Sequence, residues 1–177
     1  VDLPVPTGVA VVSVETAAQM EAALTELAPA ADVVVMAAAV ADFRPVHAVA
    51  GKIKKDHGIP QIVLEPTPDI LAGLGASKPV GQVLVGFAAE TSDLLANARG
   101  KLERKHLDLI VANDVSAPGV GFQHETNAVT LLRADGTASA VSLTDKRSVA
   151  KAVLDTVVEI RGATAAPKST SPTSPPA

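Results

Sequence analysis

Three short apolar runs recur along this chain and are separated by segments with helical periodicity. The runs are Val33–Met36, Val83–Ala88 and Leu107–Ala112. A run of this length and composition is typical of a strand buried on both faces, as in a parallel sheet covered by helices. The alternation therefore predicts an α/β fold with a mostly parallel sheet and helices on both faces.

The segments between these runs carry recognisable helix signals. Thr16 is a candidate N-cap for a helix that reaches about Ala28, and Thr91–Asp93 precedes a second helix in which leucines recur at helical spacing. Pro68 precedes a short helix, and apolar residues repeat with helical spacing near the end of the sequence. We expect these last two helices over Asp69–Gly75 and Ser148–Ile160.

Two further strands and a hairpin complete the expected fold. Val9–Val14 predicts a first strand and Ile62–Leu64 a short one, whereas the stretch from residue 39 to Gly58 lacks periodicity and reads as a loop. The apolar segments at residues 127–133 and 138–143 flank Ala-Asp-Gly-Thr, a sequence typical of a hairpin turn. We therefore expect an antiparallel hairpin added to the parallel sheet.

The length and composition indicate one folded domain with a tail. The 177 residues are 47% hydrophobic, enough to bury a single sizeable core. From residue 163 to 177 the chain is rich in Pro, Ser and Thr, and such a segment cannot bury enough apolar surface to become ordered. We predict a domain over residues 1–162 and a disordered tail over 163–177.

Several classes of function are disfavoured. The net charge of -4 gives no global attraction to nucleic acid or to an anionic membrane. The chain has no cysteine, which excludes disulfides and thiolate chemistry and favours a cytoplasmic location, and no apolar run is long enough to span a membrane. The four histidines lack zinc-site spacing, and no phosphate-binding P-loop, serine-hydrolase motif or dinucleotide glycine fingerprint is present.

A carboxylate and a lysine cluster follow the first of the three apolar runs. Asp42 lies a few residues past Met36, and Lys52, Lys54 and Lys55 come next. Lysine suits phosphate and aspartate suits a magnesium ion, and the carboxyl ends of parallel strands are where α/β proteins bind ligands. Charge alone favours a solvated surface loop for this stretch, so the position after a strand is what makes it a candidate site.

A second group of candidates follows the later strands. Lys101 and Lys105 project from one helix face one turn apart, where they suit either a phosphate ligand or the negative end of the helix dipole. Phe87 reads as a core residue or as a platform for a base, and Asn113 as a turn residue or a ligand contact. Taken singly, each of these residues favours its structural role.

Seven short motifs occur in a fixed order along the chain. They are Ala37–Pro45, Lys52–Lys55, Pro68–Leu71, Gly86–Thr91, Lys101 with Lys105, Asp108–Asp114, and Asn127. In this order they closely resemble the phosphopantothenate-cysteine ligase domain of coenzyme A biosynthesis, from about Asp2 to Ile160. In bacteria that domain is usually the C-terminal half of a bifunctional protein whose N-terminal half is a flavin-dependent decarboxylase. The resemblance implies a Rossmann-like sheet.

The resemblance also implies a reaction. In this family CTP activates the carboxylate of 4'-phosphopantothenate as an acyl-cytidylate, and the amine of L-cysteine then displaces CMP. By resemblance, Lys52 is catalytic and stabilises charge at the α-phosphate, Asp42 holds Mg2+ or Mn2+ together with the triphosphate, and Asn113 is a weaker candidate for substrate contact. The remaining expected CTP-binding positions are Ala38, Ala39, Pro68, Asp69, Ile70, Phe87, Lys101 and Lys105.

The chain departs from the family pattern at its start. Members normally carry an earlier strand, a glycine-rich turn and an Asn-x-Ser-Ser-Gly-like segment whose Asn acts on the acyl-cytidylate, and nothing in these 177 residues matches it. The decarboxylase half, where FMN would bind, is also missing from the sequence, and Thr67 replaces an Asn usual before Pro68. We therefore expect an N-terminally truncated sheet and no activity of this chain alone.

Two other functions remain open at this point. One is a non-catalytic nucleotide-binding fragment that is completed by a separate chain. The other is an NAD(P)- or flavin-dependent oxidoreductase with a Rossmann-type fold, which the missing glycine fingerprint disfavours. The expected partners under the main reading are 4'-phosphopantothenate, L-cysteine, CTP and a second copy of the chain, since the family forms dimers, with no role for nucleic acid or membrane.

Overall fold

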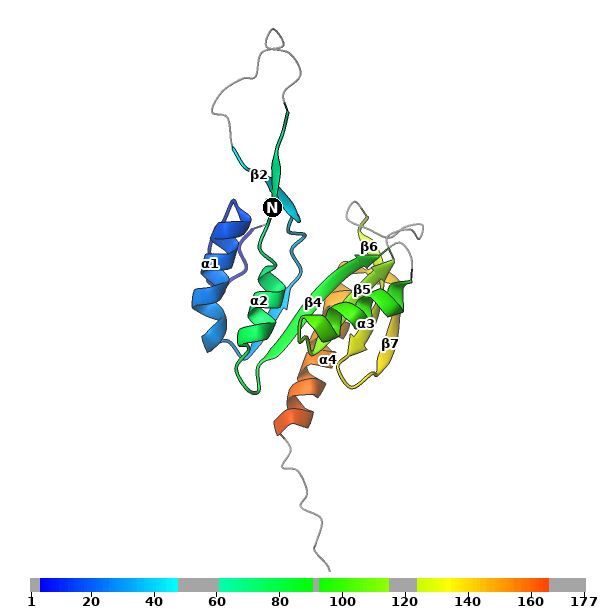
Figure 1. Cartoon of the computed structure of the whole chain (residues 1–177). Coiled ribbons are helices and arrows are strands. Elements are labelled where there is room, and N and C mark those ends of the chain that lie inside the picture. The colour runs from blue at the N-terminus through cyan, green and yellow to red at the C-terminus, as the bar shows by residue number, and fades with distance from the viewer. Residues whose placement is uncertain (1–3, 48–60, 91–92, 115–123, 166–177) are drawn as a thin grey trace, which may run out of the picture.

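A five-stranded sheet forms the centre of the molecule (Figure 1). The computed structural model describes residues 4–47, 61–90, 93–114 and 124–165. The strand order is β1 (Val33–Met36), β4 (Val83–Glu90), β5 (Leu109–Asp114), β6 (Thr126–Arg133) and β7 (Ala138–Asp145). β1, β4 and β5 run parallel, and the hairpin of β6 and β7 is antiparallel. The predicted fold class, with its hairpin addition, is confirmed.

Alternate residues of the central strands enter two separate cores, one on each face of the sheet. In β4, Leu84 and Ala88 belong to one core, whereas Val83 and Val85 belong to the other. This follows from the two-residue repeat of a strand, because successive side chains point to opposite faces. Both sets are buried, which explains why the sequence of β4 is apolar throughout rather than alternating.

Helices cover both faces. α2 (Ile70–Ser77) and α3 (Leu94–Arg104) contribute buried residues to the first core, and partly buried residues of α1 (Ala17–Leu27) pack against that core. α4 (Lys146–Ala165) covers the other face through Val149, Val153 and Val157. A short 3-10 turn, η1 (Ala28–Ala30), links α1 to β1. No helix in the described ranges combines the length and the apolar character needed to cross a membrane.

The helix predictions hold with shifted ends. Thr16 caps α1, in a box where the Thr16 side chain accepts from the Gln19 amide and the Gln19 side chain accepts from the Thr16 amide. α4 begins two residues before the expected Ser148 and reaches Ala165, so the first three residues of the expected tail are helical. Residues 166–177 lie outside the described part of the chain, and the tail prediction stays a prediction.

The expected first strand, Val9–Val14, is wrong. This segment has no regular secondary structure and pairs with no strand of the described residues, and Val11 and Val12 are each more than half exposed, at 57% and 58%. β1 is an edge strand of the sheet within the described residues, and Val9–Val14 does not pair with it. Strand propensity alone does not form a strand, because the backbone groups need a partner.

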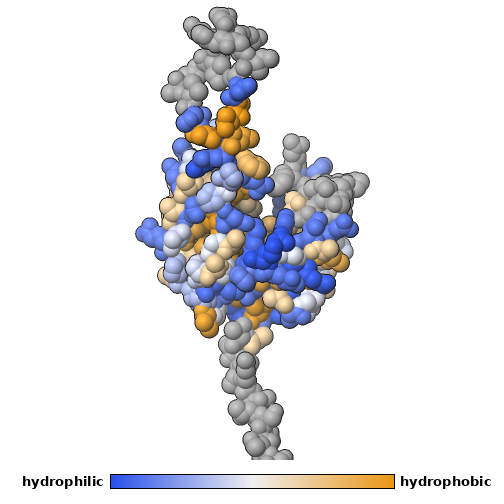
Figure 2. Space-filling model, in the orientation of Figure 1, coloured by the Kyte–Doolittle hydropathy of each residue, from blue (hydrophilic) through white to orange (hydrophobic). Residues whose placement is uncertain are grey.

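The expected loop after residue 39 contains a strand. β2 (Phe43–Pro45) pairs antiparallel with β3 (Leu64–Pro66), and a hydrogen-bonded ion pair joins Arg44 to Glu65 at 2.8 Å across the ribbon. β3 thus lies two residues later than the predicted Ile62–Leu64. The ribbon projects away from the sheet, and apolar side chains including Phe43 and Leu64 are exposed on it (Figures 1 and 2). Hairpin pairing between segments about 20 residues apart leaves no periodic signal in so short a strand.

α2 and the end of α3 approach each other unusually closely. A Cβ atom on Gly75 would overlap the carbonyl oxygen of Lys105, which is the C-cap residue of α3. Past that cap, the Leu107 amide donates to the Leu102 carbonyl and the His106 amide to the Glu103 carbonyl, which closes the helix in a Schellman motif. Glycine at position 75 therefore sets how closely Lys105 is held to α2.

We predict opposite effects for two glycine substitutions in α2. Gly75→Ala should destabilise the protein by about 2 kcal/mol or more, because the new methyl group forces the two backbones apart. Gly73→Ala should stabilise it by about 0.5–1 kcal/mol, since its Cβ meets nothing within 4 Å and alanine favours the helix. Urea unfolding of both variants measures the difference, and equal effects of the two substitutions would show that α2 and α3 do not make this contact.

Candidate functional site

A cleft of about 500 Å3 lies at the carboxyl ends of the parallel strands. Its walls come from the loop after β1, the start of α2, the end of β4 and α3, with β5, β6 and α4 closing the far side. Every candidate site residue within the described part of the chain lines it. These residues are Ala38, Ala39, Asp42, Pro68, Asp69, Ile70, Phe87, Lys101, Lys105 and Asn113.

Lys52 cannot be placed in the same way. It lies with Lys54 and Lys55 in residues 48–60, outside the described residues. The catalytic role expected for Lys52 stays a prediction, as do the individual roles of the residues that line the cleft.

Asp42 is held at the cleft by a backbone link between two distant segments. The Thr67 amide donates a 2.8 Å hydrogen bond to the Asp42 carbonyl, which joins the loop after β1 to the segment that enters α2. The side chain of Asp42 is exposed, so water can solvate its carboxylate without a partner in the protein. A carboxylate in this setting is available to a ligand or a cation.

Asp69 and Lys105 form an ion pair in the wall of the cleft. The Lys105 ammonium lies 3.0 Å from Oδ1 and 2.8 Å from Oδ2 of Asp69. Asp69 is also the N-cap of α2, because its Oδ1 accepts a 3.1 Å hydrogen bond from the Ala72 amide. The expected CTP-binding residue Asp69 therefore has two partners within the protein.

These contacts set the protonation of Asp69. Burial alone raises the pKa of its carboxyl, but the hydrogen bonds from Lys105 and the Ala72 amide outweigh that effect, and the nearby charges of Lys105 and Arg104 act in the same direction. The net result is a pKa of Asp69 below its ordinary value. The Asp69 carboxyl is therefore ionised at neutral pH.

The sheet register brings Phe87 and Asn113 onto the α4 side of the cleft. Phe87 pairs with Val111, and Ala89 pairs with Asn113. Two residues before Phe87 and Asn113 lie Val85 and Val111, which belong to the core under α4, so all four side chains point to that face of the sheet. Phe87 is 40% exposed, so its ring is open to the cleft rather than a core residue. The core reading that single-residue reasoning favoured for Phe87 is therefore wrong.

Two polar atoms at this cleft are buried and lack a hydrogen-bond partner within the described residues. They are Oδ1 of Asn113 and Oγ1 of Thr67. Burying such an atom unpaired costs about 1–3 kcal/mol, so a ligand that supplies a donor would recover that energy. Thr67 was noticed in the sequence only as a replacement for Asn.

Sequence reasoning assigned no role to two further residues in the wall. Asn127 lies at an irregularity in the β6–β7 register, where bulges commonly turn a side chain toward a site, and its Oδ1 accepts from the Ala128 amide. Lys146 is the first residue of α4, whose first turn contains no acidic residue. A lysine there is disfavoured by the helix dipole, and that local conflict is the signal that would have singled it out.

The cleft fits a magnesium ion only if a ligand supplies further oxygens. No group of three or more acidic or histidine residues gathers around one point in the described ranges. Asp42 and Asp69 both line the cleft and are exposed, and Asp69 is paired with Lys105. Magnesium is commonly held by one or two carboxylates together with substrate phosphates. The donor set therefore suits a metal that arrives with a polyphosphate.

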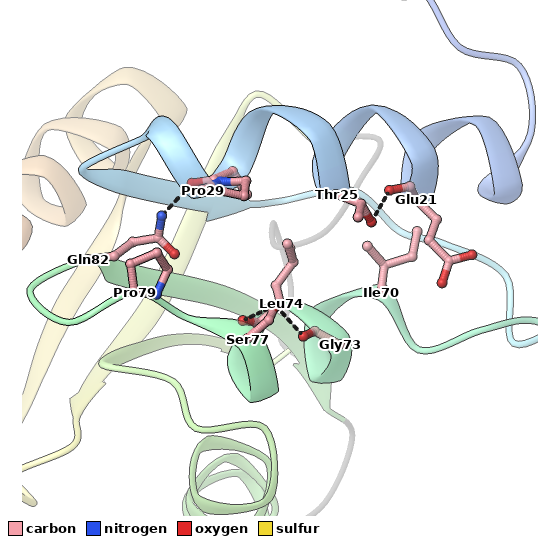
Figure 3. Close-up of a pocket in the computed structure, with 10 residues that line it drawn as sticks. Glu21, Thr25, Pro29, Ile70, Gly73, Leu74, Ser77, Pro79 and Gln82 are labelled. Carbon is pink, nitrogen blue, oxygen red and sulfur yellow. Dashed lines mark hydrogen bonds between the residues drawn. The ribbon is translucent and has the colours of Figure 1, made fainter.

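A smaller cavity of about 220 Å3 lies between α1 and α2 (Figure 3). Its polar side chains are largely committed to the protein itself. Thr25 Oγ1 donates to the Glu21 carbonyl, Ser77 Oγ donates to the Gly73 carbonyl, and Gln82 Nε2 donates to the carbonyls of Ala28 and Ala31. The bonds of Thr25 and Ser77 lie within α1 and within α2, and those of Gln82 join the residue before β4 to η1 and its C-cap, so all of them are structural. Ile70 lines both this cavity and the larger cleft.

The chain is similar to a known protein family and to several known proteins. Residues 1–160 match the family model described as DNA/pantothenate metabolism flavoprotein C-terminal domain. The chain is 45% identical over 163 residues to the coenzyme A biosynthesis bifunctional protein of Mycobacterium tuberculosis, covering 86% of the chain and 39% of that protein. It is 42% identical over 150 residues to a cysteine/cysteine sulfinic acid decarboxylase from an unknown prokaryotic organism, covering 85% of the chain and 42% of that protein.

A crystal structure shares the fold. It is the C-terminal domain of a coenzyme A biosynthesis bifunctional protein, with 35% sequence identity and a TM-score of 0.75. The alignment covers 92% of this chain and 71% of that domain. The chain thus spans about two fifths of the length of the curated relatives and most, but not all, of the crystallised domain.

We predict that Asp69→Asn will change how stability depends on pH. Asparagine still caps a helix but cannot pair with Lys105 as a charge. Because the folded-state pKa of Asp69 is lowered, the stabilisation by its carboxylate is present above the unfolded pKa of about 3.9 and is lost as the pH falls through the folded value. In urea unfolding at pH 7, the free energy of unfolding of the wild type should exceed that of the variant. This difference should disappear at pH 2–3. A gap that stays constant with pH would contradict the ion pair.

Proposed function

The chain belongs to the family of the DNA/pantothenate metabolism flavoprotein C-terminal domain, and we propose from this membership that it carries the CTP-dependent ligation step of coenzyme A biosynthesis. In that step 4'-phosphopantothenate and L-cysteine are joined through an acyl-cytidylate. Within the whole protein, the reaction gives 4'-phosphopantothenoylcysteine, CMP and pyrophosphate.

The observation that carries the proposal is one cleft that holds an exposed carboxylate, lysine ammonium groups and an exposed aromatic ring at parallel strand ends. Asp42, Lys101, Lys105 and Phe87 all line it. A nucleoside triphosphate needs this combination, since its phosphates require cations, its metal requires a carboxylate oxygen, and its base has an apolar face. These residues come from separate elements, so their convergence is a property of the fold and not of one motif.

The proposed chemistry has two balanced steps. A carboxylate oxygen of phosphopantothenate forms a bond to the α-phosphorus of CTP while the bond to pyrophosphate breaks. The cysteine amine then forms a bond to the acyl carbon, CMP leaves with the electrons of the broken C–O bond, and the amine gives up one proton to solvent. Both steps build negative charge on phosphate oxygens, which ammonium groups stabilise.

In this proposal each group of residues at the cleft has its own role. Lys101 and Lys105 bind the nucleotide from the α3 side, and Asp42 binds the divalent cation, which would neutralise triphosphate charge. Lys52 stabilises the charge at the α-phosphate. Backbone groups of Ala38, Ala39 and Pro68–Ile70, together with Phe87, surround the base. Oδ1 of Asn113, which has no hydrogen-bond partner among the described residues, offers an acceptor to a substrate or nucleotide N–H or O–H.

The oxidoreductase alternative has less support. The relatives named above are coenzyme A biosynthesis proteins and a decarboxylase, and the start of α2 at this cleft is capped by Asp69 instead of opening toward a pyrophosphate. A titration with CTP and with NADH separates the two readings. Tighter binding of NADH than of Mg2+·CTP would favour the oxidoreductase.

We further propose that these 177 residues bind CTP but do not complete the reaction alone. The sequence has no Asn-x-Ser-Ser-Gly-like segment, which the family uses on the acyl-cytidylate. We also propose that the chain pairs with a second copy of itself, as members of the ligase family do. Light scattering on the purified chain tests the pairing, and a mass of one chain of 17.9 kDa would contradict it.

The ligation step is tested by its dependence on all components. Calorimetry on the chain should detect Mg2+·CTP binding. In a protein in which the chain follows the family's Asn-containing segment, pyrophosphate release should require CTP, phosphopantothenate and Mg2+ together. Pyrophosphate release by the 177 residues alone would contradict the expected inactivity, and release in the longer protein without phosphopantothenate would contradict the proposed reaction.

Lys52 and Lys54 provide a matched pair for the catalytic role. In the longer protein, Lys52→Gln should lower the rate of acyl-cytidylate formation by about 10²-fold or more, as expected for the loss of a group that stabilises transition-state charge. Lys54→Gln removes the same charge two residues away and should leave the rate within a few fold. Pyrophosphate exchange into CTP measures the rate for both variants. If both substitutions lowered the rate equally, Lys52 would contribute only general positive charge and would not have the specific catalytic role.

A further inference from the structure

We propose that Asp69 is a positioning residue, whose carboxylate holds the Lys105 ammonium in the cleft ready for a phosphate oxygen. This inference rests on the proposed function, under which Lys105 binds the nucleotide. It gives the side chain of Asp69 a role that acts through Lys105 instead of through direct contact with the ligand.

The contact geometry leaves Lys105 able to bind a ligand. Both Asp69 oxygens lie within hydrogen-bond distance of the Lys105 ammonium, at 2.8 and 3.0 Å, on one side of it. An ammonium has three hydrogens, so a donor remains for a phosphate oxygen on the cleft side. The Lys105 side chain is 24% exposed and lines the cleft, so it is accessible as well as held.

Lys105 is fixed at its backbone as well as at its ammonium. Its carbonyl oxygen packs against Gly75 of α2, and its amide donates a 3.0 Å hydrogen bond to the Lys101 carbonyl at the end of α3. Asp69 is fixed too, as the N-cap of the same α2 that carries Gly75. A lysine normally has many rotamers, and here both of its ends are tied to one short helix.

Two opposing effects of the carboxylate must be compared. Asp69 repels a polyphosphate, but its side chain is 51% exposed, so water and salt screen that repulsion. Against this, a ligand that binds a lysine already in place does not have to immobilise it, and immobilising one long side chain reduces affinity by about three- to tenfold. We conclude that positioning outweighs repulsion, so that removal of the carboxylate weakens binding.

The test is a double-mutant cycle on Asp69 and Lys105, read by calorimetry with Mg2+·CTP and with inorganic triphosphate. Asp69→Asn keeps the helix cap and should raise both dissociation constants about fivefold, the order expected from freeing one lysine side chain. Lys105→Gln should raise them at least as much. The double variant should bind no more weakly than Lys105→Gln alone, because Asp69 has nothing left to position.

Lys101 supplies the matched control. It lies one turn before Lys105 and lines the same cleft. The proposed positioning acts through the contact between Asp69 and Lys105. The effects of Asp69→Asn and Lys101→Gln should therefore add. Unfolding curves must show Asp69→Asn folded under the assay conditions, and Asp69→Glu, which keeps the charge, should recover part of the affinity.

The outcomes separate the inference from the proposed function. Unchanged or tighter binding by Asp69→Asn, or a full additional loss in the double variant, overturns the positioning role. Binding of inorganic triphosphate but not of CTP by the wild-type chain overturns the nucleotide proposal, and the cycle then still decides the role of Asp69 at an anion site. If the wild-type chain binds neither, both proposals fail.

Discussion

The parallel pairing of β1, β4 and β5 is the constraint on which the cleft depends. Parallel strands end at the same edge of a sheet, so the loop at residues 37–42, the residues after Gly86 and Asn113 meet there although more than 70 positions separate the first from the last. Strands about 4.8 Å apart set the spacing of these groups across the cleft. Each group is ordinary alone, and only the register makes them a site.

The sequence predicts the parallel strands better than it predicts the segments outside the main sheet. Runs such as Val83–Ala88 are apolar because both faces are buried, and that burial is visible in the composition. Val9–Val14 has the same composition but no partner, and β2 is a three-residue strand whose partner β3 lies about 20 residues away. Pairing over distance is not a property of either segment, and so it could not be predicted from them.

The same distinction applies to the site. The order of the motifs predicted the residues that converge at the cleft, and the helix signal after Pro68 predicted Asp69 at the start of a helix. The Asp69–Lys105 pair joins residues 36 positions apart and depends on how closely α2 packs against α3 at Gly75. No place in the site was predicted for Thr67, Asn127 or Lys146, because that place depends on their neighbours in space. Only Lys146 breaks a local rule that the sequence displays.

The cap on α2 also bears on how the proposed site would bind phosphate. Many nucleotide-binding folds place phosphate on the free amides of a helix N-terminus. Here the carboxylate of Asp69 accepts from the Ala72 amide and already occupies that position. Under the proposed function, a phosphate near α2 would therefore be bound by side-chain ammonium groups, and Lys101, Lys105 and Lys146 line the cleft. The carboxylate that closes the backbone route also holds Lys105, so the two modes of phosphate binding exclude each other at this helix.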